Sequence, residues 1–105
     1  MIDWTKIAGF DWDNGNALKS AEKHDVGQLE AEQVFFNQPL LILEDVKHSQ
    51  IENRFHALGH TDEERLLHIT FTLRARGKLI RVISARAMHR KEKVTYEQKQ
   101  KDSEI

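Results

Sequence analysis

The stretch LIRVISARAMHRKEKVTYE, residues 79–97, decides the fold that we expect. Its first half is rich in aliphatic and β-branched residues, which favours a strand. Its second half is a long polar run after Met88 without Gly or Pro, which favours a helix. Arg81, Arg86 and Arg90 flank the join. Because a guanidinium group matches two phosphate oxygens at once, we expect these arginines to converge over a hollow where a nucleotide backbone rests.

The segment immediately before this stretch carries the most regular pattern in the chain. From Leu66 to Arg74 apolar and polar residues alternate, which is typical of a strand with one buried face. Arg76-Gly77-Lys78 is expected to form the hairpin to the next strand. The patterns farther toward the N-terminus predict strands over 40–43 and 52–58, helices over 13–24 and 27–36, and a short strand or anchor at 10–13.

The order of these elements predicts an α+β fold. Strands joined by short turns indicate a meander, so we expect an antiparallel four-stranded sheet with two N-terminal helices packed on it and a C-terminal helix. Residues 1–98 are expected to form a single domain, followed by a frayed or disordered tail at residues 99–105.

The composition excludes several classes of protein. The 105-residue chain has no Cys and no long apolar run, so a disulfide framework, a thiolate metal site and a transmembrane span are not expected. The N-terminus lacks the pattern of a signal peptide, so we expect no membrane association and a cytoplasmic location.

The net charge of −1 hides a strong asymmetry along the chain. Residues 1–73 contain six Lys or Arg and thirteen Asp or Glu, whereas residues 74–93 contain eight Lys or Arg and one Glu. A concentrated basic block indicates an anionic partner. The alternative is a strand and a helix whose basic faces are merely solvated.

Several segments, taken in order, resemble one known family. They are FDWD (10–13), KH followed by Val (23–26), VFFNQPLL (34–41), KHSQ (47–50), Glu52-x-Arg54, a Gly four residues past Phe55, and RVISAR (81–86) followed by Arg90 and Tyr96-Glu97. This ordered set resembles the BrnT toxins, which pair with BrnA antitoxins in bacterial type II toxin–antitoxin modules. The resemblance covers roughly residues 10–97.

The resemblance implies a RelE-like fold and a function. It implies a metal-independent endoribonuclease that cleaves RNA and inhibits translation, so its partners would be RNA and a BrnA-like ribbon-helix-helix antitoxin. Such antitoxins dimerise, which implies a heterotetramer. This chain has Lys23-His24-Asp25-Val26 where the family usually reads KHGV, and Ser20 where many members have Asn. The alternative function is a non-catalytic module of the same fold that binds RNA or the antitoxin.

RNA cleavage without a metal uses the neighbouring 2′-hydroxyl as nucleophile. The reaction needs a base for the hydroxyl proton, an acid for the leaving oxygen and cations for the charge on phosphorus. The candidate catalytic residues are His24, Lys23, Arg54, Arg81 and Arg86. The candidate RNA-binding residues are Lys19, Arg74, Arg90, Lys91 and Tyr96.

Each candidate also has a structural alternative. Arg81 lies in mid-strand and is equally suited to pairing with Glu52 across the sheet. Glu52 itself is expected to orient Arg54 or Arg81 rather than to catalyse. His24 ends a predicted helix, where a histidine can simply complement the helix dipole. Tyr96, together with Val94, is slightly better suited to packing in the core.

The six histidines raise the question of a metal site. His56 and His60 are four residues apart but span a predicted strand end and a turn, so their side chains need not converge. His48 with Ser49 is typical of a turn or cap. Without Cys or an H-x-x-x-H pattern on a clear helix, we expect neither a metal site nor another cofactor.

Overall fold

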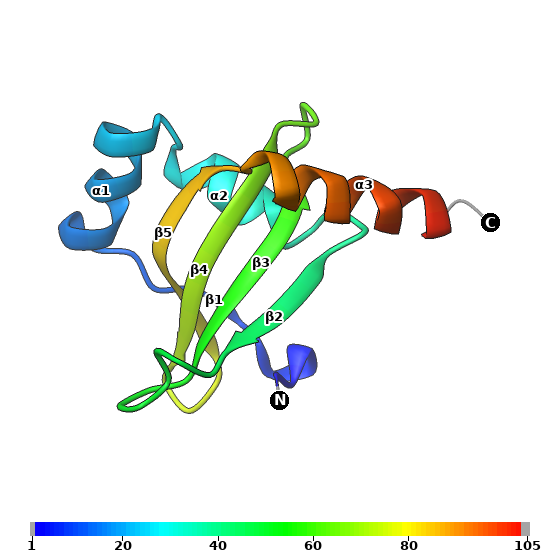
Figure 1. The fold of residues 1–105 in the computed structure, drawn as a ribbon. Helices are drawn as coiled ribbons and strands as arrows, with labels where there is room; N and C mark the ends of the chain where they lie inside the picture. The colour runs from blue at the N-terminus through cyan, green and yellow to red at the C-terminus, as the bar shows by residue number, and fades with distance from the viewer. Residues whose placement is uncertain (1, 104–105) are drawn as a thin grey trace.

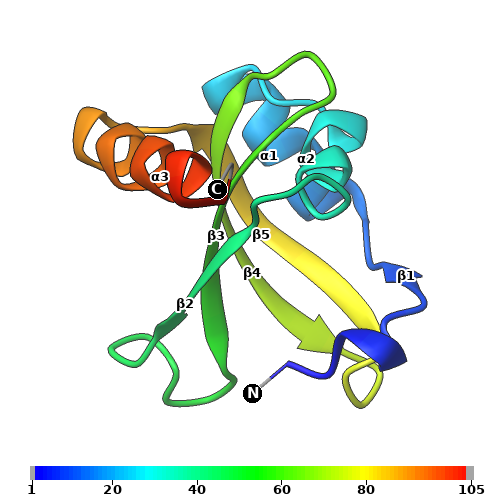
Figure 2. The same ribbon diagram turned by 90° about the vertical axis from the view of Figure 1, so that its right-hand side faces the viewer.

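The computed structural model describes residues 2–103 as a three-layer arrangement of helices and strands. Figure 1 shows the helix α3 crossing one face of a twisted sheet, and Figure 2 shows the helices α1 and α2 on the other face. The elements in chain order are η1 (Trp4–Lys6), β1 (Gly9–Phe10), α1 (Asn14–His24), α2 (Gln28–Val34), β2 (Leu41–Asp45), β3 (Arg54–His60), β4 (Leu66–Arg74), β5 (Leu79–Ala87) and α3 (Arg90–Ser103).

The sheet has five strands in the order β1-β5-β4-β3-β2. Strands β2 to β5 form the predicted antiparallel meander, whereas β1 pairs in parallel with β5. The prediction of a four-stranded, purely antiparallel sheet is therefore wrong, although the α+β class and the three predicted helices are confirmed. A two-residue strand is too short to show an alternating pattern, so the sequence could not reveal where it pairs.

The outer edge of β5 is closed by α1 as well as by β1. The Asn16 side-chain amide donates to the carbonyl of Val82 at 2.9 Å, and the Ser20 hydroxyl oxygen accepts from the backbone N–H of Ala85 at 2.8 Å. Both α1 side chains are buried. These bonds satisfy backbone groups that an open sheet edge would leave unpaired, and they fix α1 against β5.

The main core lies between the sheet and the helices α1 and α2. Its buried residues are Val26, Ala31, Val34, Phe55, Ala57, Leu67, Ile69, Phe71, Ile80, Val82 and Ala85. A smaller core on the opposite face contains Leu58, Met88 and Tyr96. The second core anchors α3 across the sheet, so every strand from β3 to β5 has one face against the main core and the other turned toward α3.

Tyr96 belongs to this smaller core and is not on the surface. Its side chain is fully buried, its hydroxyl donates to the carbonyl of Pro39 at 2.7 Å, and Nδ1 of His60 lies 2.7 Å from the hydroxyl oxygen. Burial raises the pKa of Tyr96 to about 12. The prediction that Tyr96 contacts RNA is therefore wrong, because its ring has no open face on which a base could stack.

The C-terminal helix is longer than predicted. It continues to Ser103 and so includes residues 99–103 of the segment predicted to be frayed, while residues 104 and 105 lie outside the described residues. Within residues 2–103 no helix combines the length and the apolar character needed to cross a membrane.

Candidate functional site

The face of the sheet turned toward α3 gathers most of the polar side chains of the strands, and we call it the open face. Strand pairing arranges them in rows: Arg54, Thr72 and Arg81 in one, His56, Thr70 and Ser84 in the next, and Leu58, His68 and Arg86 in the third, beside α3. Neighbouring residues of the same strands point into the main core. The open face therefore brings guanidinium, imidazole and hydroxyl groups together from three strands.

A β-bulge in β5 decides which arginines share this face. Phe71 pairs with Val82, but Thr70 pairs with Ser84, so Ile83 is the extra residue of β5. Strict alternation would place residues 81 and 86 on opposite faces. The bulge shifts the alternation by one residue, and Arg81 and Arg86 therefore lie on the same face.

His56 is held by a hydrogen bond on each ring nitrogen. Its Nε2 lies 2.9 Å from Oδ2 of Asp45, and its Nδ1 lies 3.0 Å from the hydroxyl oxygen of Thr70. Burial disfavours ionisation of Asp45, but hydrogen bonds from His48 and His56 outweigh this effect and hold the pKa of Asp45 below its usual value. An ionised Asp45 accepts a hydrogen bond from Nε2–H of His56, and the proton-free Nδ1 is then the nitrogen that can act as a base.

His68 lies next to His56, with 4.8 Å between the ring centroids. Burial and the positive charge of Arg86 lower the pKa of His68 to about 4. Its imidazole is therefore neutral at neutral pH. Its Nδ1 atom is buried and makes no hydrogen bond within the described part of the chain.

The arginines at the seam of β5 and α3 are each held by a carboxylate. Nη1 and Nη2 of Arg86 donate to the two carboxylate oxygens of Glu92 at 2.8 and 3.0 Å. Arg81 lies 3.5 Å from Asp11 and 3.0 Å from Asp13. The expected convergence over a shared hollow is thus wrong for this pair, because each guanidinium is turned toward its own acidic partner.

Glu92 is the acidic group that turns Arg86 toward α3. The hydrogen bond from Arg86 is the main cause that lowers the pKa of Glu92 to about 2. Oxygen Oε1 also accepts from the backbone N–H of His89 at 2.8 Å, and Oε2 lies 3.8 Å from Nε2 of His68. Glu92 therefore connects the start of α3 to the open face.

Arg74 and the two basic candidates of α3 lie apart from the arginines of β5. Glu52 pairs with Arg74, so both expected partners of Glu52, Arg54 and Arg81, are wrong. Arg90 and Lys91 are exposed in the first turn of α3. Among the described residues, no hydrogen bond or ion pair connects either of them to the arginines of β5.

The candidates on α1 lie in another layer of the molecule. Lys19, Lys23 and His24 are exposed, and α1 lies on the side of the sheet opposite α3 (Figure 2). The backbone carbonyl of His24 accepts from Arg65 at 3.4 Å. The structure therefore does not bring these three residues together with the open face.

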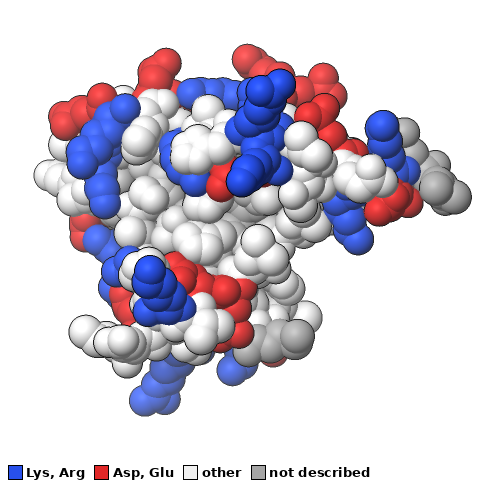
Figure 3. All heavy atoms as spheres, in the orientation of Figure 1, with Lys and Arg blue, Asp and Glu red and all other residues white. Residues whose placement is uncertain are grey.

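Charges of both signs alternate around the open face. Figure 3 views the molecule from the side crossed by α3, and it shows Lys and Arg atoms at the margin, interleaved with Asp and Glu atoms, around a largely uncharged middle. The basic block of the sequence is thus divided by acidic side chains from other segments. Arg54 differs from Arg81 and Arg86, because it makes no ion pair within residues 2–103.

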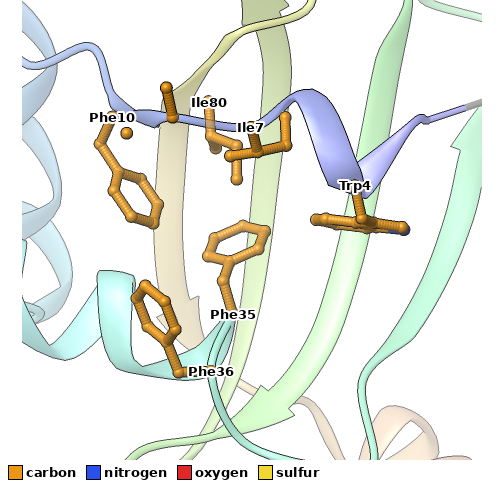
Figure 4. A pocket seen from close by; sticks show the side chains of 8 residues that line it. Trp4, Ile7, Phe10, Phe35, Phe36 and Ile80 are labelled. Atoms are coloured by element: carbon orange, nitrogen blue, oxygen red, sulfur yellow. The ribbon is translucent and has the colours of Figure 1, made fainter.

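Two cavities differ in the chemistry that they can support. One, of about 340 Å³, is lined by Trp4, Ile7, Ala8, Gly9, Phe10, Phe35, Phe36 and Ile80 and contains no ionisable side chain (Figure 4). It therefore cannot supply an acid or a base. The other, of about 400 Å³, is lined by Lys47, His48, Gln50, Ile51, Glu52 and Arg54, and it opens beside the Arg54 end of the open face.

The sequence did not identify the pair of histidines on the open face. His56 and His68 come from different strands, and only the register of β3 against β4 makes them neighbours. The alternation of His68 with Thr70 and Thr72 was visible, but it gave no partner for these residues. Among residues 2–103 no group of three or more His, Cys, Asp or Glu side chains is arranged to hold a metal ion.

Comparison with known families gives an assignment for most of the chain. A family model described as the ribonuclease toxin BrnT of type II toxin–antitoxin systems matches residues 12–92. A search of curated proteins found no match. The matched segment includes β2 to β5 and the first turn of α3, and so contains the whole open face.

Proposed function

Because the chain belongs to the BrnT family of ribonuclease toxins of type II toxin–antitoxin systems, we propose that it cleaves RNA on the open face of its sheet without a metal ion. The observation that carries this proposal is the placement of His56, backed by Asp45, beside Arg54, which makes no ion pair within residues 2–103. A base and a cation are thereby held about 7 Å apart along β3, since a strand rises roughly 3.3 Å per residue. A RelE-like fold relationship belongs to the same proposal.

His56 acts as the base in the proposed reaction. The 2′-hydroxyl of RNA replaces the Thr70 hydroxyl as the donor to Nδ1 of His56 and gives up its proton there. The 2′-oxygen then attacks the adjacent phosphorus, the bond to the 5′-oxygen of the next nucleotide breaks, and that oxygen takes up a proton from water. The products are a 2′,3′-cyclic phosphate end and a 5′-hydroxyl end.

Arg54 stabilises the negative charge that builds up on the phosphate oxygens. Positioned cations of this kind often stabilise the transition state more than any other group in an active site. Arg81 and Arg86 stand at the other side of the same face, and their carboxylate partners limit the donors that they can offer to a phosphate. Arg90 and Lys91, exposed at the start of α3, contact the RNA backbone at the margin.

Induced expression in a bacterium that lacks the antitoxin tests this function. Growth arrest with RNA fragments that end in 2′,3′-cyclic phosphate is the expected result, and translation stops as a consequence. Continued growth with intact RNA would contradict the proposal. The protein acts in the cytoplasm, where its RNA substrate is found.

A second candidate function is a non-catalytic module that binds RNA or an antitoxin. The observation that favours it is the neutralisation of Arg81 and Arg86 by Asp13 and Glu92, which leaves less free positive charge than a phosphate-cleaving site would use. Purified protein mixed with RNA separates the two functions. Retention of RNA without fragments favours binding alone.

The partner of the proposed toxin is a BrnA-like ribbon-helix-helix antitoxin in a heterotetramer. Family membership implies a protein antitoxin, and we propose that it covers the open face. A mixture of toxin and antitoxin should then release bound RNA and have the mass of two copies of each chain. If the toxin bound RNA and antitoxin at the same time, the antitoxin would have to bind a surface other than the open face.

A further inference from the structure

The cavity lined by the loop that connects β2 to β3 adjoins the open face but is not part of it. Arg54 belongs to both, and the Asp45 carboxylate accepts from His56 of the open face and from His48 of the cavity wall, with Nδ1 of His48 at 3.0 Å. An RNA strand bound at His56 would therefore pass directly into this cavity at one end.

The charges in the cavity favour an anion. Within the described part of the chain, Lys47 and Arg54 make no ion pair, whereas Glu52 is paired with Arg74 and Asp45 is shared by two histidines. Both cations are therefore available, the charge of Glu52 is balanced by Arg74, and the Asp45 carboxylate is occupied by hydrogen bonds with two histidines. A phosphate group is the anion that an RNA strand would bring to this place.

The other lining residues suit a nucleobase. Ile51 is fully exposed, and Gln50 lies beside it in the cavity wall. A simple anion would use neither residue. An exposed apolar side chain can cover the face of an unstacked base, and an amide can both donate to and accept from its edge.

The loop that carries these residues is held in place by its own hydrogen bonds. The Ser49 hydroxyl donates to the carbonyl of Asp45 and accepts from the backbone N–H of Arg54 at 3.0 Å. The backbone N–H of His48 donates to the Asp45 carboxylate at 3.2 Å. Binding here would consequently require little ordering of the loop.

We propose that this cavity is a nucleotide subsite that binds the phosphate and base of single-stranded RNA next to the cleaved bond. Lys47 holds this flanking phosphate, beside Arg54 at the cleaved one, and Gln50 and Ile51 receive the base. This inference rests on the proposed function, because it assigns a flanking position on the same RNA substrate.

Binding of a single-stranded RNA of about ten nucleotides to the full chain carrying His56→Ala tests the subsite, because this background removes the proposed base. Adding Lys47→Ala should weaken binding about tenfold and reduce the slope of log affinity against log salt by about 0.7, the value for one phosphate on a single strand. Lys101→Ala, which removes an exposed lysine of α3, is the matched control and should leave both unchanged.

Adding Ile51→Ser should weaken binding of the same RNA without changing the salt slope, because it removes contact with a base and no charge. Val94→Ser, at another exposed apolar residue, is its control. Unchanged affinity in both loop variants would overturn the subsite. If only Lys47→Ala weakened RNA binding, the cavity would be an anion site, and its assignment as a nucleotide subsite would be overturned. Absence of any RNA binding in the background would refute the proposed function as well.

Discussion

At the scale of single residues, the two histidines of the open face have opposite environments. His56 has a partner on each ring nitrogen. Nδ1 of His68, in contrast, is buried with no partner among the described residues, and the pKa of His68 is lowered to about 4. The carboxylate of Asp45 keeps Nε2 of His56 protonated, while the charge of Arg86 opposes protonation of His68. Of the two, only His56 has a carboxylate at hydrogen-bond distance that orients its ring.

The lowered pKa of His68 makes stability depend on pH. The unfolded chain binds a proton at this residue near pH 6.5, whereas the folded chain does so only near pH 4. The stability that the neutral form provides is therefore complete above pH 6.5 and is lost as the pH falls toward 4. His68→Gln should flatten the dependence of the unfolding free energy on pH in this window, measured by urea denaturation.

His89→Gln is the control for this measurement, because His89 is exposed. Equal slopes between pH 6.5 and 5 in the parent and His68→Gln would contradict the assigned environment. Glu92, whose pKa is lowered to about 2, affects stability in a separate pH range. Its contribution to the unfolding free energy is present above pH 4.5 and is lost only below that pH.

Glu92→Gln tests whether Arg86 faces bound RNA. The change weakens the two charged hydrogen bonds from Arg86, so the free energy of unfolding should fall by about 1–3 kcal/mol. The freed guanidinium should at the same time raise RNA affinity, which filter binding at several salt concentrations would measure. Unchanged or reduced affinity in the folded variant would show that Arg86 does not contact RNA.

At the scale of elements, the approach of α2 to β3 depends on a residue without a side chain. A Cβ atom at Gly59 would lie 2.5 Å from Cγ1 of Val34, a buried residue of α2. Real Cβ atoms do not approach a neighbour so closely, so α2 would have to move. This packing gives a physical reason for the Gly that lies four residues past Phe55 in the sequence.

Gly59→Ala should lower the free energy of unfolding by about 1–3 kcal/mol, the usual cost of overpacking a core. Chemical denaturation would measure the change. Gly9→Ala is the matched control, because its added Cβ would meet Leu79 at an ordinary 3.7 Å. If the two variants were equally stable, α2 would not be packed as tightly on β3 as described.

The hydrophobic patterns of the sequence predicted the strands of the meander, but they did not reveal which side chains share a face of the sheet. The alternation from Leu66 to Arg74 gave β4 with its observed bounds, because one side of that strand faces the main core and the other does not. The bulge at Ile83 left no such sign, and it decides that Arg81 and Arg86 share a face. Core packing of Tyr96 was only one of two interpretations of the sequence, since α3 is largely polar and the cluster with Leu58 and Met88 that buries the ring forms only in the fold.

At the scale of the whole molecule, the sheet separates two groups of candidate residues. Lys19, Lys23 and His24 lie with α1 on one side, and the open face lies on the other (Figure 2). Sequence order could not reveal this separation, because it depends on β1 and α1 closing the outer edge of β5. It also could not reveal that Asp11 and Asp13, from before α1, would pair with Arg81.

The rate of RNA cleavage by purified variants tests most directly whether the open face is the active site. His56→Ala should lower the cleavage rate by roughly 10²–10⁴-fold, the usual contribution of a general base, and Arg54→Ala should also lower it, while both proteins stay folded. His24→Ala on α1 and Lys101→Ala near the end of α3, at exposed residues that take no part in the proposed reaction, should retain the parent rate. Full activity of His56→Ala together with loss of activity in His24→Ala would contradict this assignment and place the catalytic base on α1.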